Sequence, residues 1–522
     1  MKTKLRLSFT LAIVVILAIT SLTSAQYPGY QWGTAYQLVN TGDASGTISV
    51  NYYDQNGVEQ TGSARNYADL PPLGSVLVVQ KKDDPGLNGT YSAIISADVP
   101  TSAIVNQQLY LPGGTNPYPP FSSYSGFSSG SRNVFLPAIM YNYYNFYTEI
   151  YIMNVGSSPA TVDIRYYPAT VQGSVIGKSG VTEQVTVPAN ASKLVSQQAK
   201  TALGEVRCGT QSCFFGSATL SSTQDIAVVV NQHNPVQKKL MTYNGVASGA
   251  VKLAVPNYMR TYYEYYTALT ISNMDATNPA CVRLTYTPDP TQSKKVNGTP
   301  IDVNQDTVVV EHVIPPLNSL LRFDGFTATD DQSDLDDLVN YSQFFGTVQV
   351  ESFIGSIGST TCSSAVNLAG IINIESRRDR NSQGGSFNAI DVSSATNTII
   401  APIILADYYG YYTNLTIQNT TNLAGTCTFT YMSGPDSSVP NQQKSYTHPI
   451  TPFGQITIYE GRKGTPRGDI NTDPFWNSAS GRRFIGAAKI VCDSGVKVVG
   501  FTNEEKDIMY IDSMYTFSTI NR

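Results

Sequence analysis

Hydrophobic and polar residues alternate in short stretches along this chain, and one arrangement recurs in four of them. It places a threonine, two apolar residues and an asparagine at every second position, so that the four side chains share one face of an extended strand. The four occurrences are Thr34, Tyr36, Leu38 and Asn40; Thr148, Ile150, Ile152 and Asn154; Thr267, Leu269, Ile271 and Asn273; and Thr413, Leu415, Ile417 and Asn419. The sequence therefore predicts internal repeats.

Two further elements follow each of these strands in the same order. A second alternating strand ends in tyrosine, at Tyr52, Tyr166, Tyr286 and Tyr431, and a final apolar strand leads to asparagine, at Asn106, Asn231, Asn373 and Asn503. Turns rich in Gly, Pro and Asn separate the strands, and no strand is followed by the pattern of a helical crossover. Short strands in this order are typical of two-sheet sandwiches.

The predicted fold is all-β, with four tandem immunoglobulin-like β-sandwich domains after a cleaved signal peptide. A chain of 522 residues is too long for one core, which agrees with several domains. The expected segments are a signal peptide at 1–25, repeat 1 at 26–110, a Pro/Gly/Ser-rich linker at 111–133, repeat 2 at 134–243, repeat 3 at 250–376, a polar linker at 377–397, and repeat 4 with a C-terminal strand at 398–522. The spacing leaves the relative orientation of the four domains open.

The N-terminus has the pattern of a secretory signal. Lys2, Lys4 and Arg6 precede an apolar run at 11–19, and small residues lead to a cleavage point before Gln26. The alternative is an uncleaved membrane anchor, but the run is shorter than the roughly 20 residues that a span needs. We therefore expect a secreted protein, either extracellular or at the cell surface, with no membrane span in the mature chain.

Charge argues against nucleic acid as a partner. Only 14% of residues are charged and the net charge is -5, so no basic face is available to neutralise phosphates.

The six cysteines predict three disulfides in an exported protein. Cys362 and Cys492 lie at the same place relative to the last asparagine of their repeats, and Cys281 and Cys427 both lie on the second strand. The expected pairs are therefore Cys281 with Cys362, Cys427 with Cys492, and Cys208 with Cys213. Zinc ligation is the alternative, but none of the three histidines is grouped with a cysteine.

Tyrosines gather just before the Thr-to-Asn strand in repeats 2 to 4. The candidate binding residues are Tyr143, Tyr144, Tyr147, Tyr262, Tyr263, Tyr265, Tyr266, Tyr408, Tyr409, Tyr411 and Tyr412. Rigid amphipathic rings suit contacts with sugars or with a protein partner. The alternative is that they pack between domains or cover the end of a domain.

Other candidate chemistry is sparse. Asp330, Asp331 and Asp334 form a weak candidate for calcium, because they lack the spacing of an EF-hand loop, and a solvated loop is the favoured interpretation. The histidines lie in different repeats, and no catalytic motif or cofactor motif is present. We therefore expect no cofactor and no enzymatic activity.

The repeats resemble immunoglobulin-like modules of bacterial secreted and cell-surface proteins, including the cell-adhesion-related type. The resemblance is carried by the Thr-to-Asn strand, the second strand ending in tyrosine, the proline turn and final strands such as Ala227 to Gln232. It covers nearly all of the mature chain. It implies a structural or adhesive role, and it assigns no binding residue.

The leading hypothesis is a non-enzymatic extracellular structural or adhesive protein of the bacterial cell surface or matrix. It would act by self-association or by contact with surface or matrix polymers, and exposed sheet edges would support such contacts. The alternative is a carbohydrate-binding protein whose tyrosine-rich loops stack on sugars, with polysaccharide as the partner. A secreted hydrolase is the least favoured hypothesis.

Overall fold

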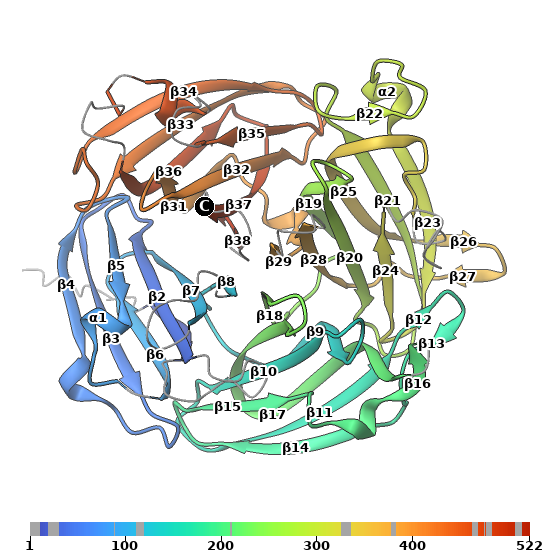
Figure 1. Ribbon diagram of the computed structural model, residues 1–522, viewed down its shortest axis with the longest axis horizontal. Coiled ribbons are helices and arrows are strands. Elements are labelled where there is room, and N and C mark those ends of the chain that lie inside the picture. Colours follow the sequence, from blue (N-terminus) through green and yellow to red (C-terminus); the bar gives the residue numbers. More distant parts are fainter. Residues whose placement is uncertain are drawn as a thin grey trace, which may run out of the picture.

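The computed structural model is almost entirely β-structure, and its strands follow one another around a closed ring (Figure 1). The structure describes residues 11–18, 31–87, 89–110, 120–208, 211–324, 336–376, 383–461, 468–473, 475–476, 483–506 and 514–522. Four groups of strands occupy successive parts of the ring, and we call them sectors 1 to 4. They contain β1 to β8, β9 to β18, β19 to β30 and β31 to β39, coloured from blue to red in Figure 1.

The elements of the first two sectors are short strands with one helix of a single turn. Sector 1 contains β1 (Leu11–Ala18), β2 (Gln31–Asn40), β3 (Gly46–Tyr53), β4 (Arg65–Leu70), β5 (Ser75–Val79), α1 (Gln80–Asp83), β6 (Thr90–Ala97), β7 (Thr101–Tyr110) and β8 (Phe121–Ser125). Sector 2 contains β9 (Ser131–Tyr141), β10 (Tyr147–Asn154), β11 (Ala160–Pro168), β12 (Thr170–Val171), β13 (Ser174–Val175), β14 (Thr182–Val187), β15 (Ser192–Ser196), β16 (Glu205–Cys208), β17 (Gln211–Asn234) and β18 (Lys239–Asn244).

The other two sectors follow the same plan. Sector 3 contains β19 (Lys252–Arg260), β20 (Tyr265–Asn273), β21 (Ala280–Pro288), β22 (Lys294–Lys295), α2 (Val303–Asp306), β23 (Val308–Ile314), β24 (Ser319–Phe323), β25 (Tyr341–Phe353), β26 (Gly355–Ile357), β27 (Thr360–Cys362), β28 (Leu368–Ser376), β29 (Gly384–Asn388) and β30 (Ile390–Asp391). Sector 4 contains β31 (Thr398–Ala406), β32 (Tyr411–Asn419), β33 (Gly425–Ser433), β34 (Gln443–Ile450), β35 (Gln455–Tyr459), α3 (Asp469–Thr472), β36 (Phe484–Cys492), β37 (Val498–Lys506), β38 (Met514–Ser518) and β39 (Ile520–Asn521).

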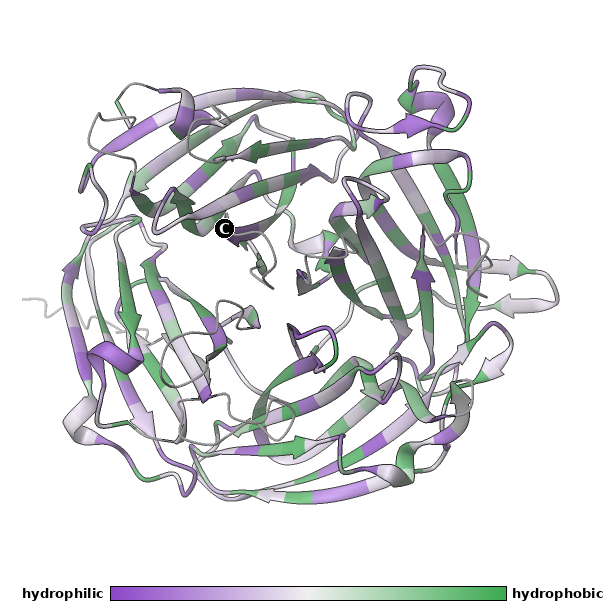
Figure 2. Cartoon of the chain, viewed as in Figure 1, coloured by the Kyte–Doolittle hydropathy of each residue, from purple (hydrophilic) through white to green (hydrophobic). Residues whose placement is uncertain are grey.

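Antiparallel sheets pack in two layers within each sector. The inner layer has the orders β5-β2-β7-β8, β24-β20-β28-β29 and β35-β32-β37-β38, and the outer layer has the orders β1-β6-β3-β4, β23-β21-β25-β19-β30 and β34-β33-β36-β31-β39. In sector 2 the long β17 belongs to both layers and joins them into one sheet. Hydrophobic residues concentrate along the strands and alternate with hydrophilic ones, as Figure 2 shows. The all-β prediction is confirmed.

The recurring asparagine has the same structural role in all four sectors. The side chain of Asn40 donates to two backbone carbonyls and accepts from the backbone NH of Gly42, two residues later. Asn154, Asn273 and Asn419 make the equivalent three contacts. Each of these side chains is completely buried. The residue therefore satisfies the buried backbone groups at the turn that leaves the strand.

The apolar run that predicts a signal peptide is a strand in this structure. Residues 11–18 form β1, which pairs antiparallel with β6 from Leu11 opposite Ala97 to Ala18 opposite Thr90. In the other sectors β9, β19 and β31 pair with the corresponding strands β17, β25 and β36. The stretches expected as linkers, 111–133 and 377–397, also contain strands. Within them, β8 pairs antiparallel with β7, and β29 pairs antiparallel with β28.

The disulfide prediction is confirmed. Cys208 pairs with Cys213, Cys281 with Cys362 and Cys427 with Cys492. Each bridge lies within one sector, so the contacts between sectors are entirely non-covalent apart from the chain itself.

Reciprocal amide pairs join neighbouring sectors at two places. Gln107 of β7 and Asn231 of β17 each donate to the other's side-chain oxygen, at 3.1 and 3.2 Å. Gln232 of β17 and Asn373 of β28 do the same at 3.1 and 2.9 Å. All four side chains are buried, so these bonds satisfy polar groups that water does not reach.

The strands nearest the ring centre also bond to one another in a closed circle. Ser123 Oγ of β8 donates to the carbonyl of Thr516 in β38, and Thr516 Oγ1 donates to the carbonyl of Ser386 in β29. Asn388 of β29 donates to the carbonyl of Asn244 in β18, and the Asn244 side chain donates to the carbonyl of Ser125 in β8. A cavity of about 350 Å³ lies between these four strands.

The ring closes at the contact between sector 4 and sector 1, which we call the seam. Gln37 Nε2 donates to the carbonyl of Pro402 across it, and Arg522 makes an ion pair with Asp43. A separate apolar cluster fills the seam, formed by Ile104, Ile403, Leu405, Ile485 and Phe517. By contrast, the sector 1 core continues directly into residues of sector 2 such as Tyr151 and Met153.

Candidate functional site

Three tight hairpins place one tyrosine each at an exposed tip. They join β9 to β10, β19 to β20 and β31 to β32, and their first and last residues form mutual backbone bonds, as between Tyr143 and Phe146. The two central residues have positive φ, as a type I′ turn requires. The first of them is tyrosine each time: Tyr144, Tyr263 and Tyr409 are 59%, 62% and 63% exposed. We call these residues the tyrosine tips.

Each tip rests on the tyrosine that precedes it. The ring centroids of Tyr143 and Tyr144 are 4.8 Å apart in an edge-to-face arrangement, and Tyr262 with Tyr263 and Tyr408 with Tyr409 repeat it at 4.8 and 4.9 Å. The supporting ring is itself anchored, because Tyr143 stacks on Phe215 and Tyr262 packs on Phe345. The tips are therefore held by packing and not only by the turn.

The tips have a backbone conformation that is unfavourable for their side chain. Tyr144, Tyr263 and Tyr409 have φ values of 50°, 48° and 51°. The left-handed region costs a residue with a side chain about 1–2 kcal/mol, and glycine or asparagine usually takes such a place. A bulky residue in this conformation at three equivalent positions is the kind of strain that accompanies function.

The remaining candidate tyrosines pack within the molecule. Tyr143 and Tyr412 are buried, and Tyr147 donates to Asn142 Oδ1 at 2.9 Å. Tyr266 stacks with Phe323, and the Lys506 ammonium lies 4.8 Å above the ring of Tyr411. Tyr262, Tyr265 and Tyr408 are partly buried against hydrophobic clusters or against Phe345 and Gln383. The structure thus divides the candidate set into three tips and their supports.

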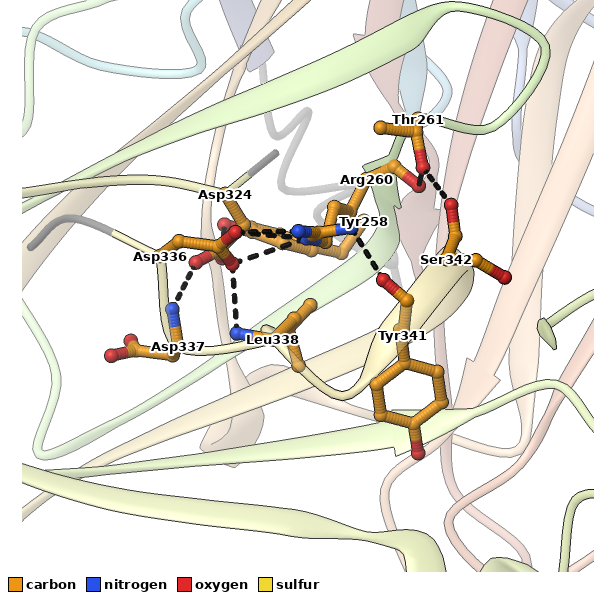
Figure 3. Close-up of polar contacts among 9 residues, drawn as sticks. All are labelled: Tyr258, Arg260, Thr261, Asp324, Asp336, Asp337, Leu338, Tyr341 and Ser342. Carbon is orange, nitrogen blue, oxygen red and sulfur yellow. Dashed lines mark hydrogen bonds and ion pairs between the residues drawn. The ribbon is translucent and has the colours of Figure 1, made fainter. Parts of the chain in front are cut away.

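Acidic residues of sector 3 form a buried network next to the expected calcium loop (Figure 3). Arg260 binds the carboxylate of Asp336 at 2.7 Å, and Tyr258 donates to Asp324. Arg322, which the figure does not draw, binds Asp337. Burial and the nearby charge of Asp337 raise the pKa of Asp324 well above its usual range. These carboxyls already have arginine, tyrosine or backbone partners, which suits a structural role. Asp330, Asp331 and Asp334 lie outside the described residues.

A tyrosine bonded to an acid recurs in the other sectors. The hydroxyl of Tyr52 donates to Asp84, that of Tyr166 to Glu183 and that of Tyr431 to Glu460. Burial and the neighbouring Asp469 raise the pKa of Glu460 to about 8. In sector 3 the hydroxyl of Tyr286 donates to Asp337. Since each sector has such a pair near the end of its second strand, we interpret the pairs as core architecture. Within the described part of the chain, no group of three His, Cys, Asp or Glu residues is arranged to hold a metal ion.

A cavity of about 260 Å³ lies at the seam, between sectors 1 and 4. Glu504 of β37 lines it together with Asn106 of β7 and Gln37 of β2. The sequence analysis missed these residues. The available signal was the pair that ends the final strand of each repeat, which is Asn-Gln at 106–107 and 231–232, Asn-Ile at 373–374 and Asn-Glu at 503–504.

Comparison with known proteins identifies no family for this chain, so any functional assignment has to come from its structure. No protein-family model matches the sequence, and no curated protein matches it significantly. Among the helices that the structure describes, none has the length and apolarity needed to cross a membrane. The three disulfides fit an oxidising compartment outside the cytoplasm.

Proposed function

We propose that this protein is a non-enzymatic extracellular adhesive scaffold, in which four immunoglobulin-like sandwiches form a ring that presents tyrosine tips to polymers of the cell surface or matrix. The observation that supports this most directly is the exposure of Tyr144, Tyr263 and Tyr409 at equivalent turns. Secretion and the four-domain organisation are parts of the same proposal.

Three equivalent contacts on one molecule favour a repetitive partner. A polymer offers the same chemical group many times, so that binding at one tip raises the local concentration of the group at the next. Tyrosine supplies a large contact area at a low cost in side-chain entropy, and its hydroxyl adds a hydrogen bond. Individually weak contacts of this kind add up to firm retention.

The acidic clusters support a role without catalysis. Asp84, Glu183, Asp337 and Glu460 are each paired with tyrosine or arginine, and this pairing recurs from sector to sector. An active site normally singles out one unit of a repeated protein, with its reacting groups open to substrate.

Replacing the tips tests the proposal. We expect Tyr144→Ala, Tyr263→Ala and Tyr409→Ala to weaken retention on the bound polymer about three- to tenfold each, and the triple variant to weaken it about 100-fold or more. The measurement is co-sedimentation with insoluble cellulose, chitin and peptidoglycan, each with matched washing. Phe453→Ala is the control, because Phe453 is also an exposed aromatic residue at positive φ, on a different turn.

Equal retention of the triple variant and the unmodified protein would reject the tyrosine tips as the binding surface. A carbohydrate-binding protein is the second candidate function, favoured by the exposed tyrosine rings at the tips, because the face of an aromatic ring suits the apolar face of a sugar. Sedimentation velocity across concentrations separates the two. Concentration-dependent polymers that the triple variant fails to form would indicate adhesion by self-association, and monomers retained on one polysaccharide would indicate carbohydrate binding.

A further inference from the structure

The cavity at the seam has apolar walls from both sectors. Leu77 of β5 lies on the sector 1 side, and Ile403, Leu405 and Ile485 lie on the sector 4 side. Tyr408 and Tyr411 also line it, below the hairpin that carries the Tyr409 tip. At about 260 Å³ it has room for one small organic molecule.

Three polar side chains at this cavity have buried oxygen atoms without a hydrogen bond. Glu504 is 1% exposed, and neither of its carboxyl oxygens has a partner in the described structure. The same holds for Oδ1 of Asn106 and for Oε1 of Gln37, whose Nε2 is already used across the seam. The Asn106 amide is near enough to lower the pKa of Glu504, although it makes no hydrogen bond of good geometry.

The register shows why this site is unique to the seam. Gln107, Gln232, Ile374 and Glu504 each lie opposite the first threonine of the neighbouring strand, at Thr34, Thr148, Thr267 and Thr413. The two glutamines close their contacts by pairing with the asparagine of the next sector. At the same place in sector 4, the carboxyl group of Glu504 replaces the amide, and it forms no reciprocal hydrogen bonds with Asn106.

We propose that the seam cavity binds a small organic ammonium ion, with its charged end at Glu504 and its apolar body against Leu405 and Ile485. An ammonium group has three donors and no acceptor, which matches a site whose unpaired atoms are the oxygens of Glu504, Asn106 and Gln37. The proposal is independent of the tyrosine tips.

The protonation of Glu504 couples this binding to pH. Burial raises the pKa of Glu504 to about 8, so the empty site holds a proton at neutral pH. A bound ammonium ion favours the carboxylate and releases that proton, so affinity rises about tenfold per pH unit below pH 8. The other charged groups at the cavity are Lys81, whose side chain is exposed, and Lys506, which lies over Tyr411.

Calorimetric titration of the intact protein with benzylamine at pH 6, 7 and 8 tests the proposal, with benzyl alcohol as the uncharged probe of the same shape. We expect benzylamine to bind about tenfold more tightly at pH 7 than at pH 6, and benzyl alcohol to bind at least tenfold more weakly than benzylamine at pH 8. Glu504→Gln should reduce benzylamine affinity at pH 8 at least tenfold and remove its pH dependence.

Glu460→Gln is the matched control, because Glu460 is an equally buried acid of sector 4 with a similarly raised pKa but does not line the cavity. It should leave benzylamine binding unchanged. Any of three results would overturn the proposal: benzyl alcohol binding as tightly as benzylamine, pH-dependent benzylamine binding that survives Glu504→Gln, or no heat of binding at millimolar benzylamine at pH 8.

Discussion

The contact between sectors 1 and 2 and the seam between sectors 4 and 1 are built from the same strand positions but differ in chemistry. At the first, Gln107 and Asn231 satisfy each other, and Thr242 adds a bond to Asn231 at 2.8 Å. At the second, Glu504 faces Asn106 without a hydrogen bond, beside a cavity. The contact with an amide at this position is therefore fully hydrogen-bonded, whereas the contact with a carboxyl group has a titratable side chain beside a cavity.

The two contacts also differ in how their apolar residues are organised. The core of sector 1 includes Ala227 and Val229 of sector 2, so that the contact is an extension of one core. The cluster at the seam is separate from the cores on either side. A contact that shares a core loses stability in both sectors when it opens, whereas the seam can open while each core stays intact.

Removing the amide pair should give the largest effect. Asn231→Leu leaves Gln107 buried without its partner, and we expect the free energy of unfolding to fall by about 2–3 kcal/mol. Urea unfolding followed by tryptophan fluorescence measures this, because Trp32, one of the two tryptophans of the chain, lies beside His233 at the same contact. Asn503→Leu is the control, since Asn503 holds the same place on its strand as Asn231 but its side chain donates to Glu505 of its own sector, and its Oδ1 has no partner in the described structure. Equal losses in both variants would contradict the role of the amide pair.

The pH dependence of stability should sharpen the comparison at the seam. The pKa of Glu504 is raised from 4.5 to about 8, so between these values the unfolded chain has released a proton that the folded protein still holds. The free energy of unfolding therefore falls as pH rises through this window, by up to about 1.4 kcal/mol per pH unit, and levels off above pH 8. Glu504→Gln should lack this component. Urea unfolding of both proteins from pH 4 to pH 9 measures the difference, and parallel curves would contradict it.

The ion pair at the outer part of the seam should matter least. Asp43 binds Arg522 and lies 3.5 Å from Lys489, but its side chain is 74% exposed. Exposed pairs contribute little because water and salt screen them. We expect Asp43→Asn to leave the urea midpoint within experimental error at 150 mM salt. A clear loss of stability that persists at 1 M salt would show that this pair, and not the apolar cluster, holds the seam.

The alternating pattern predicts the Thr-to-Asn strand, the second strand and the final strand of each repeat, but not β1, β8 or β29. The pairing of Cys281 with Cys362 follows from the equal distance of Cys362 and Cys492 to the last asparagine of their repeats, and local pattern carries that information. The closure of the ring depends on pairs such as Gln107 with Asn231, which lie 124 residues apart. Periodicity shows which face of a strand is buried, but not which side chain of another unit lies opposite.

The tyrosine-rich turns show the same limit at close range. Tyr143 and Tyr144 are adjacent in the sequence, yet the first is buried on Phe215 and the second is mostly exposed. The register of a two-residue turn decides which ring faces outward, and several tyrosines in a row leave that register open. The residues at 11–18 are a further example, because an apolar run suits a signal peptide and a β-strand equally well.

The course of the chain gives the ring a mechanical property. Among the described residues, the backbone connects sector 1 to 2, 2 to 3 and 3 to 4, and neither backbone nor disulfide crosses the seam. A tensile load between sectors 1 and 4 therefore acts first on the side-chain contacts at the seam, because no covalent bond joins the two sectors there. We expect stretching of the molecule to separate sectors 1 and 4 before any sheet unfolds.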